Sequence, residues 1–154
     1  PFGVSAGGTL AMNLAYNGNS AIPVRFVFQV AAPTYFEPSE WTLLMKVDKL
    51  ASEHDFCKMM TGKELEDYTQ EIQKISPAGI VSDDSVPSLI AYGRIDHCVP
   101  VNQKNYLMEA YLFHDVPYDY IEFPKSNHGM YNDPEKLQEF LEKSLEYAER
   151  YFAA

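Results

Sequence analysis

The feature that most constrains the fold is an alternation of short apolar runs with segments of helical periodicity. Three runs rich in β-branched and aromatic residues lie between glycine or proline signals: AIPVRFVFQVAAP at 21–33, PSLIAYG at 87–93 and YDYIEFP at 118–124. Runs of this kind are typical of buried strands. Helical spacing marks 9–16, 101–115 and the segment that begins at Pro134. Strands that alternate with helices predict an α/β protein with a mostly parallel sheet flanked by helices.

Each predicted helix has an apolar side that we expect to be buried. The first carries Leu10 and Leu14 on one face with Ala11 and Ala15 beside it, and it stops at Asn17. The second and third show these apolar residues at helical spacing: Tyr106, Ala110 and Phe113 in the second, and Leu137, Phe140, Leu141, Leu145 and Ala148 in the third. Asp133 can cap the third helix, and Pro134 suits its first position.

Residues 35–75 interrupt the alternation and are predicted to form a helical insertion or cap. Two helical patterns occur within it: Leu43, Leu44, Val47 and Leu50, then Leu65, Tyr68, Ile72 and Ile75. The insertion also holds large apolar residues that either roof a substrate pocket or pack the insertion onto the body: Trp41, Met45, Phe56, Met59 and Met60. The sequence leaves both alternatives open.

Length and composition indicate one globular domain over residues 1–154, with 46% hydrophobic residues. The 22 acidic and 12 basic residues give a formal net charge of -10, which argues against nucleic acid and anionic membranes as partners. A neutral or cationic small molecule fits this charge better. The sequence has no apolar run of the roughly 18 residues that a membrane helix needs and no signal peptide, so a cytoplasmic location is expected. The same net charge has a second explanation, since a charge far from zero keeps many cytosolic proteins soluble.

Cys57 and Cys98 are the two cysteines, and they lie far apart in the chain. Neither takes part in a CxxC or Cys/His ligand spacing. The sequence therefore predicts reduced thiols, with no disulfide scaffold and no metal site.

The stretch GVSAGG contains a GxSxG motif centred on Ser5 and is followed directly by a predicted helix. In a nucleophile elbow, the serine occupies a sharp strand-to-helix turn that exposes its hydroxyl. We expect Gly3 and Gly7 to leave room for this turn, since side chains there would crowd the crossing of strand and helix. The motif alone is also compatible with a plain loop or a turn that cradles phosphate.

Two downstream loops supply the other groups that a serine nucleophile requires. Asp96 follows the predicted strand at 87–93, and His128 follows the next strand on a turn. Side chains after the carboxyl ends of parallel strands project into the ligand crevice. The chain order Ser5, Asp96, His128 is the order of the α/β-hydrolase arrangement and differs from those of chymotrypsin and subtilisin.

Other candidate groups have weaker positions. Asp83 and Asp84 precede their strand, and Asp133 is better placed as a helix cap. His97 adjoins Asp96 but is expected to point away, and His54 and His114 lie on helical or helix-end segments where solvated surface is usual. Cys98 follows a strand in the loop of Asp96 rather than an elbow, so we expect an inert thiol.

The stretches GVSAGGTLA, SPAGIVSDDSVPSLIAYGRIDHCVP and FPKSNHGM together resemble the carboxylesterase and lipase-like branch of the α/β-hydrolase superfamily. The resemblance extends nearly from end to end. It implies that Ser5 is the nucleophile, that His128 is the base, that Asp96 orients the histidine and that the Ala6 N–H is one oxyanion donor.

In that superfamily the elbow follows several strands and a glycine-rich HGGG-like turn. The resemblance therefore implies a partial α/β-hydrolase fold, the C-terminal half from the elbow onward, without its N-terminal strands. An open sheet edge would then favour a homodimer or a swapped oligomer.

Three functions agree with these observations. The favoured one is hydrolysis of a small-molecule carboxylic ester through an acyl-enzyme, which requires no cofactor. The second is a serine peptidase like the prolyl oligopeptidases. The third is a non-catalytic, truncated fragment that oligomerises.

Overall fold

The computed structural model describes residues 1–154 except for 19, 42–51, 63–67, 69–70 and 153–154. Its centre is a parallel sheet of four strands in the order β1, β2, β3, β4: β1 (Phe2–Val4), β2 (Val27–Val30), β3 (Ser88–Gly93) and β4 (Tyr118–Phe123). The predicted runs at 21–33, 87–93 and 118–124 contain β2, β3 and β4, so the α/β prediction is confirmed.

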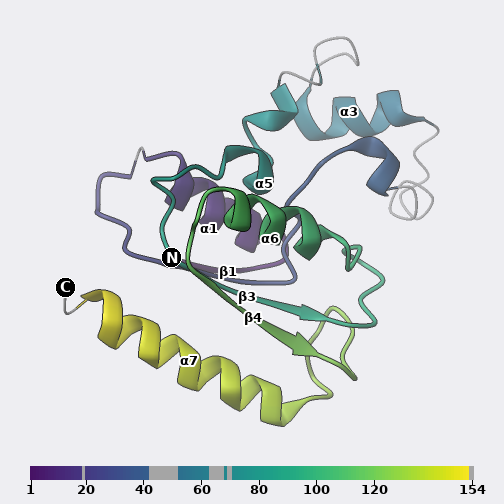
Figure 1. Ribbon diagram of the computed structural model, residues 1–154. Coiled ribbons are helices and arrows are strands. Elements are labelled where there is room, and N and C mark those ends of the chain that lie inside the picture. The colour runs from purple at the N-terminus through teal and green to yellow at the C-terminus, as the bar shows by residue number, and fades with distance from the viewer. Residues whose placement is uncertain (19, 42–51, 63–67, 69–70, 153–154) are drawn as a thin grey trace.

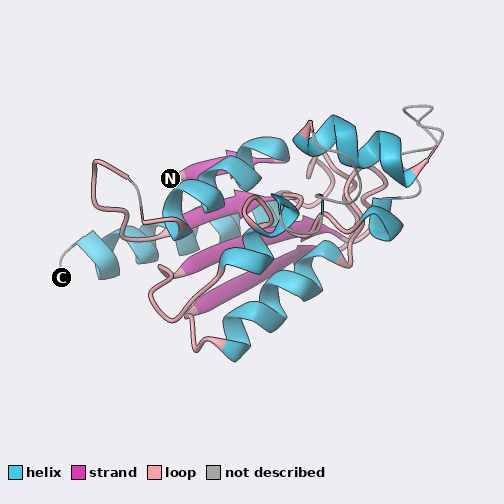
Figure 2. Cartoon of the chain, turned by 90° about the horizontal axis from the view of Figure 1, so that it is seen from above, coloured by secondary structure: helices cyan, strands magenta, loops and turns pink. Residues whose placement is uncertain are grey.

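Helices cover both faces of the sheet (Figure 1). One face carries three helices: α1 (Ala6–Tyr16), α5 (Pro77–Ile80) and α6 (Gln103–Phe113). The long α7 (Pro134–Phe152) crosses the opposite face. Seen from above in Figure 2, α1 and α6 run alongside the strands over which they pack. The expected helices at 9–16 and 101–115 and after Asp133 all form.

The sheet separates two apolar cores, and β3 shows why. All six of its residues are buried. Ile90 joins a cluster with α1 and α6, whereas Leu89 and Ala91 point to the other side and join a cluster with α7. Successive side chains of a strand point to opposite faces, so a strand with helices on both sides reads as one continuous apolar run.

The buried face of α1 differs from the prediction. Leu10 is 70% exposed and Leu14 is 49% exposed, whereas Ala11 and Ala15 are buried. The helix lies so close to β2 that a Cβ added to Gly8 would stand 2.7 Å from the Cβ of Ala32. Gly8 permits this close approach, and α1 turns Ala11, Met12, Ala15 and Tyr16 toward the core, so the leucines lie on the outside.

The predicted stripe of α7 is buried only in part. Phe140 is buried, but Leu137, Leu141 and Leu145 are 48%, 51% and 66% exposed. The helix turns Phe140 and the unpredicted Tyr147 toward the sheet, where both ring systems contact Phe28. Large rings bury more area than leucine side chains, which favours this rotation of the helix.

The insertion contains two described elements, a 3₁₀ turn at Pro38–Trp41 and α3 (Glu53–Thr61). Trp41 and Phe56 are buried in a third apolar cluster together with Tyr92 of β3, so they fasten the insertion to the body. Met59 is 49% exposed and takes no part. These predicted apolar residues lie outside the described residues: Leu43, Leu44, Met45, Val47, Leu50 and Leu65.

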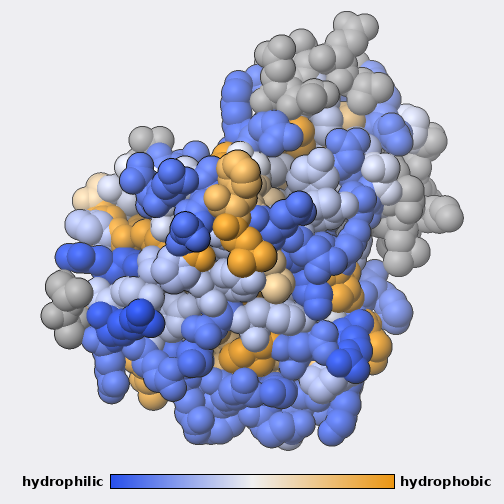
Figure 3. Space-filling view, in the orientation of Figure 1, coloured by the Kyte–Doolittle hydropathy of each residue, from blue (hydrophilic) through white to orange (hydrophobic). Residues whose placement is uncertain are grey.

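The surface retains several large apolar side chains, which Figure 3 shows as orange patches in a mainly hydrophilic face. Leu112 and Phe113 at the end of α6 are 69% and 83% exposed. Phe2 and Val4 of the edge strand β1 are 59% and 48% exposed. Within the described part of the chain, no helix is long and apolar enough to cross a bilayer.

Candidate active site

Ser5 forms the turn between β1 and α1, as the GxSxG motif predicts. Its backbone has φ 54° and ψ -130°, a positive φ that a side chain other than glycine rarely adopts. Such strain costs about 1–3 kcal/mol and is concentrated at functional sites. The Ser5 N–H donates to the Val30 oxygen at 2.8 Å, and the Ser5 side chain makes no capping hydrogen bond to α1. Its hydroxyl is therefore held at the turn without a structural role in the helix cap.

Two glycines make this turn possible. A Cβ at Gly3 would stand 2.0 Å from the Gly7 oxygen, so the expectation for Gly3 is borne out by the packing. The expectation for Gly7 is wrong, because a Cβ there would meet nothing within 4 Å. Gly8 is instead the second tight position, where a Cβ would stand 2.7 Å from the Cβ of Ala32, just after β2. The crossing of helix and strand falls one residue later than the motif suggests.

The Ala6 N–H is the first backbone donor of α1. The first N–H groups of a helix have no acceptor in a preceding turn, and the helix dipole adds partial positive charge there. This position can stabilise an anion that develops beside the Ser5 hydroxyl.

Asp96 lies in the turn after β3 and is held by its own loop. Its Oδ1 accepts hydrogen bonds from the backbone N–H groups of Cys98 at 2.8 Å and Val99 at 3.0 Å. Its Oδ2 lies 2.8 Å from Nδ1 of His128. The side chain of Asp96 is 0% exposed. The carboxylate is thus buried, doubly anchored on one oxygen and directed at the imidazole with the other.

His128 reaches this carboxylate because its loop packs closely on the end of β3. A Cβ on Gly93 would lie 2.5 Å from the carbonyl oxygens of both Ser126 and Asn127. Glycine at position 93 therefore lets the loop approach the strand. The imidazole remains 27% exposed, so one side of the ring is open to the surroundings.

Asp133 fixes the same loop from the other side. Its Oδ2 accepts from the Ser126 hydroxyl at 2.6 Å, and both its oxygens lie within 3.2 Å of the Lys125 N–H. The Ser126 hydroxyl in turn accepts the Asn132 N–H at 3.0 Å. Asp133 directly precedes α7, and its backbone oxygen accepts from Lys136 and Leu137, whereas the hydrogen bonds given for its side chain go to Lys125 and Ser126 and not to the start of the helix. The link between Asp133 and the loop of His128 could not be predicted from the local sequence, because an acidic residue directly before a helix is first interpreted as a helix cap.

The three predicted residues lie at one edge of the sheet. Ser5, Asp96 and His128 follow the carboxyl ends of β1, β3 and β4, and all four strands are parallel. Asp96 and His128 are hydrogen-bonded. His128 also lines a cavity of about 440 Å³ together with Val4, the residue before Ser5, and Val30, whose carbonyl holds the Ser5 N–H. The structure thus brings Asp96 and His128 into contact and places Ser5 at the same edge of the sheet, where a hydroxyl can act as a nucleophile once an oriented imidazole reaches it.

A second cavity, of about 430 Å³, lies beside the elbow on the insertion side. Ala6, Leu10 and Thr9 of α1 form one wall, and the opposite wall includes Trp41 and Phe56 of the insertion. Nearly all of the lining is apolar. Trp41 and Phe56 therefore pack the insertion onto the body, and they also line this cavity.

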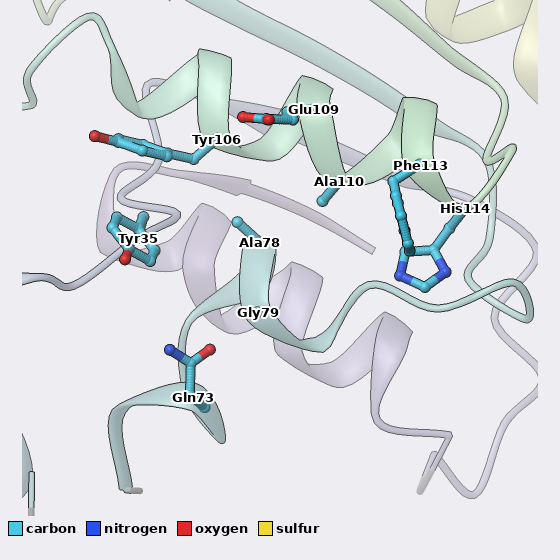
Figure 4. Close-up of a pocket in the computed structure, with 9 residues that line it drawn as sticks. All are labelled: Tyr35, Gln73, Ala78, Gly79, Tyr106, Glu109, Ala110, Phe113 and His114. Carbon is cyan, nitrogen blue, oxygen red and sulfur yellow. The ribbon is translucent and has the colours of Figure 1, made fainter. Parts of the chain in front are cut away.

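Another pocket of about 410 Å³ lies between α5 and α6 (Figure 4). Its lining includes Tyr35, Tyr106 and His114 and none of the three predicted catalytic residues. His114 Nδ1 lies 2.6 Å from Asp83 Oδ1, and the two residues form an ion pair when His114 is protonated.

The comparisons with known proteins agree with this geometry. The sequence profile described as the prolyl oligopeptidase family matches residues 2–154. The chain belongs to the prolyl oligopeptidase family. No curated protein matches the sequence.

Solved structures with the same fold include esterases and peptidases. An acetyl ester-xyloside bifunctional hydrolase from Caldicellulosiruptor lactoaceticus superposes with a TM-score of 0.68 at 18% identity, over 97% of this chain and 55% of that one. A thermophilic esterase from Thermogutta terrifontis gives 0.70 at 17%, over 97% and 54%. Dipeptidyl peptidase 4 from Porphyromonas gingivalis gives 0.69 at 17%, over 96% and 19%.

These similarities establish the fold of this prolyl oligopeptidase family member as that of an α/β-hydrolase, so the predicted superfamily is confirmed. The chain spans about half the length of the two esterases and about a fifth of the peptidase. The family that matches is the one that the sequence offered as an alternative to the esterase branch.

Proposed function

We propose that this chain carries the catalytic triad of a serine hydrolase that cleaves carboxylic esters through an acyl-enzyme. The observation that carries the proposal is the 2.8 Å hydrogen bond between a buried, anchored Asp96 and His128, at the sheet edge where Ser5 forms a strained strand-to-helix turn. A structural ion pair would not require a serine with positive φ at the same edge.

The residues have distinct roles in this mechanism. Nδ1–H of His128 donates to Asp96, which leaves Nε2 free to accept the proton of the Ser5 hydroxyl. The Ser5 oxygen attacks the ester carbonyl, and the Ala6 N–H stabilises the oxyanion. His128 then returns the proton to the leaving alcohol, and water hydrolyses the acyl-enzyme by the same route in reverse.

The apolar cavity beside Ala6 is proposed to hold the acyl part of the ester. It starts at the residue whose N–H faces the oxyanion, and aromatic rings of the insertion close it. A volume of about 430 Å³ lies within the range of small-molecule pockets. Its apolar lining favours a hydrocarbon group over a charged one.

A fluorophosphonate probe tests the catalytic proposal, because it reacts with an activated serine and needs no known substrate. Wild-type protein should be labelled on Ser5, Ser5→Ala should give no labelling, and His128→Ala should label at least about 10³ times more slowly. Circular dichroism verifies that each variant is folded. Folded wild-type protein that stays unlabelled would refute the proposal and favour a non-catalytic role.

The cavity is tested by a matched pair of substitutions on α1. Leu10→Trp fills the cavity from an exposed position, and Leu14→Trp adds the same ring at an exposed position of the same helix that does not line it. With p-nitrophenyl esters, Leu10→Trp should slow the octanoate much more than the acetate. Leu14→Trp should leave that ratio unchanged. An unchanged ratio in both variants would place the acyl group elsewhere.

The second candidate is a serine peptidase, which the prolyl oligopeptidase family match favours. The same triad serves both reactions, so the substrate decides between them. Comparison of p-nitrophenyl butyrate with a glycyl-prolyl p-nitroanilide separates the two. Cleavage of the ester alone supports the esterase, and cleavage of the anilide at comparable kcat/KM supports the peptidase.

A further inference from the structure

Cys98 stands directly beside the hydrogen-bonded pair of Asp96 and His128. One ligand atom from each of the three residues, the thiol sulfur, a carboxylate oxygen and an imidazole nitrogen, lies within 4.8 Å of the other two. The Cys98 residue is exposed, whereas Cys57 is buried in the core of the insertion. The expectation of a cysteine without metal-ligand neighbours rested on spacing along the chain alone, and the fold places two such neighbours beside this thiol.

The loop geometry brings the thiol to this position. The backbone N–H of Cys98 donates to Asp96 Oδ1 at 2.8 Å, so the carboxylate binds the residue that carries the thiol. Oδ1 also accepts from Val99, which leaves Oδ2 as the oxygen that faces His128. The thiol and the carboxylate therefore lie on one anchored loop, and the imidazole of His128 lies beside them.

We propose that Cys98, Asp96 and His128 form an inhibitory site for Zn²⁺ or a similar borderline-soft divalent cation such as Cd²⁺. Thiolate, imidazole and carboxylate are the three ligand types that such ions take from proteins. In a tetrahedral zinc site with bonds of about 2.0–2.3 Å, ligand atoms stand about 3.5 Å apart. The three ligand atoms lie within 4.8 Å of one another, and the exposed Cys98 side chain can adjust toward that spacing. The 2.8 Å between His128 Nδ1 and Asp96 Oδ2 would widen to it.

The exchange of protons is balanced in this step. The cation replaces the thiol proton of Cys98, which passes to solvent, and the Nδ1 proton of His128, which is exchanged for a proton on Nε2 so that the imidazole stays neutral; one proton is released in all. New bonds form from the metal to Sγ, Nδ1 and Oδ2, and a water molecule takes the fourth position on the exposed side. No oxidant, reductant or other reactant is needed.

The inhibitory part of this inference rests on the proposed function, whereas cation binding does not. The bond that the metal replaces, Nδ1–H to Asp96 Oδ2, is the one that orients His128 as the base. A metal at Nδ1 fixes the ring in the ligand geometry instead and removes the anionic partner that stabilises the protonated imidazole. Occupancy should therefore stop transfer of the Ser5 proton, and a chelator should restore it.

The binding test uses Cd²⁺ titrated into the whole folded chain, since cadmium bound to thiolate absorbs in the near ultraviolet. We expect one equivalent to produce this band in wild-type protein, and Zn²⁺ to displace it. Cys98→Ala keeps the backbone N–H and removes only the ligand, so affinity should fall at least about 10–100-fold. Cys57→Ala is the matched control that should keep both the band and the affinity. A wild-type protein without the band, or a Cys98→Ala variant with wild-type affinity, would overturn the proposal.

The inhibition test compares fluorophosphonate labelling of Ser5 with and without Zn²⁺ for each protein. Zn²⁺ should protect wild-type and Cys57→Ala proteins, EDTA should reverse the protection, and Cys98→Ala should need at least about tenfold more Zn²⁺. Labelling that continues in the zinc-saturated wild type would refute inhibition. If the cadmium band depends on Cys98 but Ser5 is never labelled, the cation site stands and the proposed hydrolase function fails.

Discussion

Gly93→Ala tests the inference that the loop of His128 keeps its position because the last residue of β3 has no side chain. The added methyl carbon would stand 2.5 Å from the carbonyl oxygens of Ser126 and Asn127, whereas ordinary contacts begin at 3.4 Å. The loop must therefore withdraw by about 1 Å, because neither the strand backbone nor the carbonyls can rotate away as a flexible side chain could. Overpacking of this kind costs about 1–3 kcal/mol of the free energy of unfolding.

The same displacement should impair the site more than the fold. His128 follows Asn127 directly, so a withdrawal of the loop lengthens the 2.8 Å bond from Nδ1 to Asp96. A misplacement of about 1 Å in a catalytic group costs on the order of 10²-fold in rate. We expect fluorophosphonate labelling of Ser5 to slow by about that factor.

Gly7→Ala is the matched control, because it adds the same methyl group inside α1 where nothing lies within 4 Å. Alanine in a helix should raise the free energy of unfolding by roughly 0.5–1 kcal/mol. Urea unfolding followed by circular dichroism measures both variants, and a time course of labelling measures the site. Wild-type stability together with a wild-type labelling rate in Gly93→Ala would refute the reasoning.

Three further predictions concern the stability of the fold and its association into oligomers. Asp133→Ala should lower the free energy of unfolding by about 1–3 kcal/mol in a urea titration, since the buried Ser126 hydroxyl loses its acceptor; an unchanged midpoint would contradict this. Burial raises the pKa of Tyr16 to about 12, and an unfolded tyrosine ionises near pH 10, so stability should fall as the pH rises from about 10 to 12. Tyr16→Phe should reduce that slope, and an equal slope in both proteins would disprove the assignment. We also expect a homodimer or swapped oligomer through the open edge of β1, detectable by sedimentation, and Val4→Lys should shift it to monomer; wild-type protein that sediments as a monomer would exclude this.

The sequence predicted the order and kind of the elements well because strand and helix periodicities are local properties. It also placed Asp96 and His128 after neighbouring strands, and in a parallel sheet the ends of such strands meet at one edge. The strand limits were predicted too long at 21–33, since only Val27–Val30 pairs with neighbours. Pairing depends on the partner strands, which local periodicity does not describe.

The faces of the helices were predicted less well. Leu10 of α1 and Leu145 of α7 are apolar residues at helical spacing, yet both are exposed. Periodicity shows that a helix has an apolar side, but the distance to the sheet decides which residues fit beneath it. The packing of α1 buries Ala11, Met12, Ala15 and Tyr16, and that of α7 buries Phe140 and Tyr147.

By itself, the sequence determined an α/β protein with a serine on a glycine-flanked turn and with an acid and a histidine on later loops, because each of these depends on residues close together in the chain. Only the tertiary structure decided that Gly8 and Gly93 are the tight positions, that Asp133 holds the histidine loop and that Cys98 lies beside Asp96 and His128. Asp96 and His128 stand 32 residues apart in the chain and 2.8 Å apart in space. The packing of whole elements sets such distances, and no local pattern contains them.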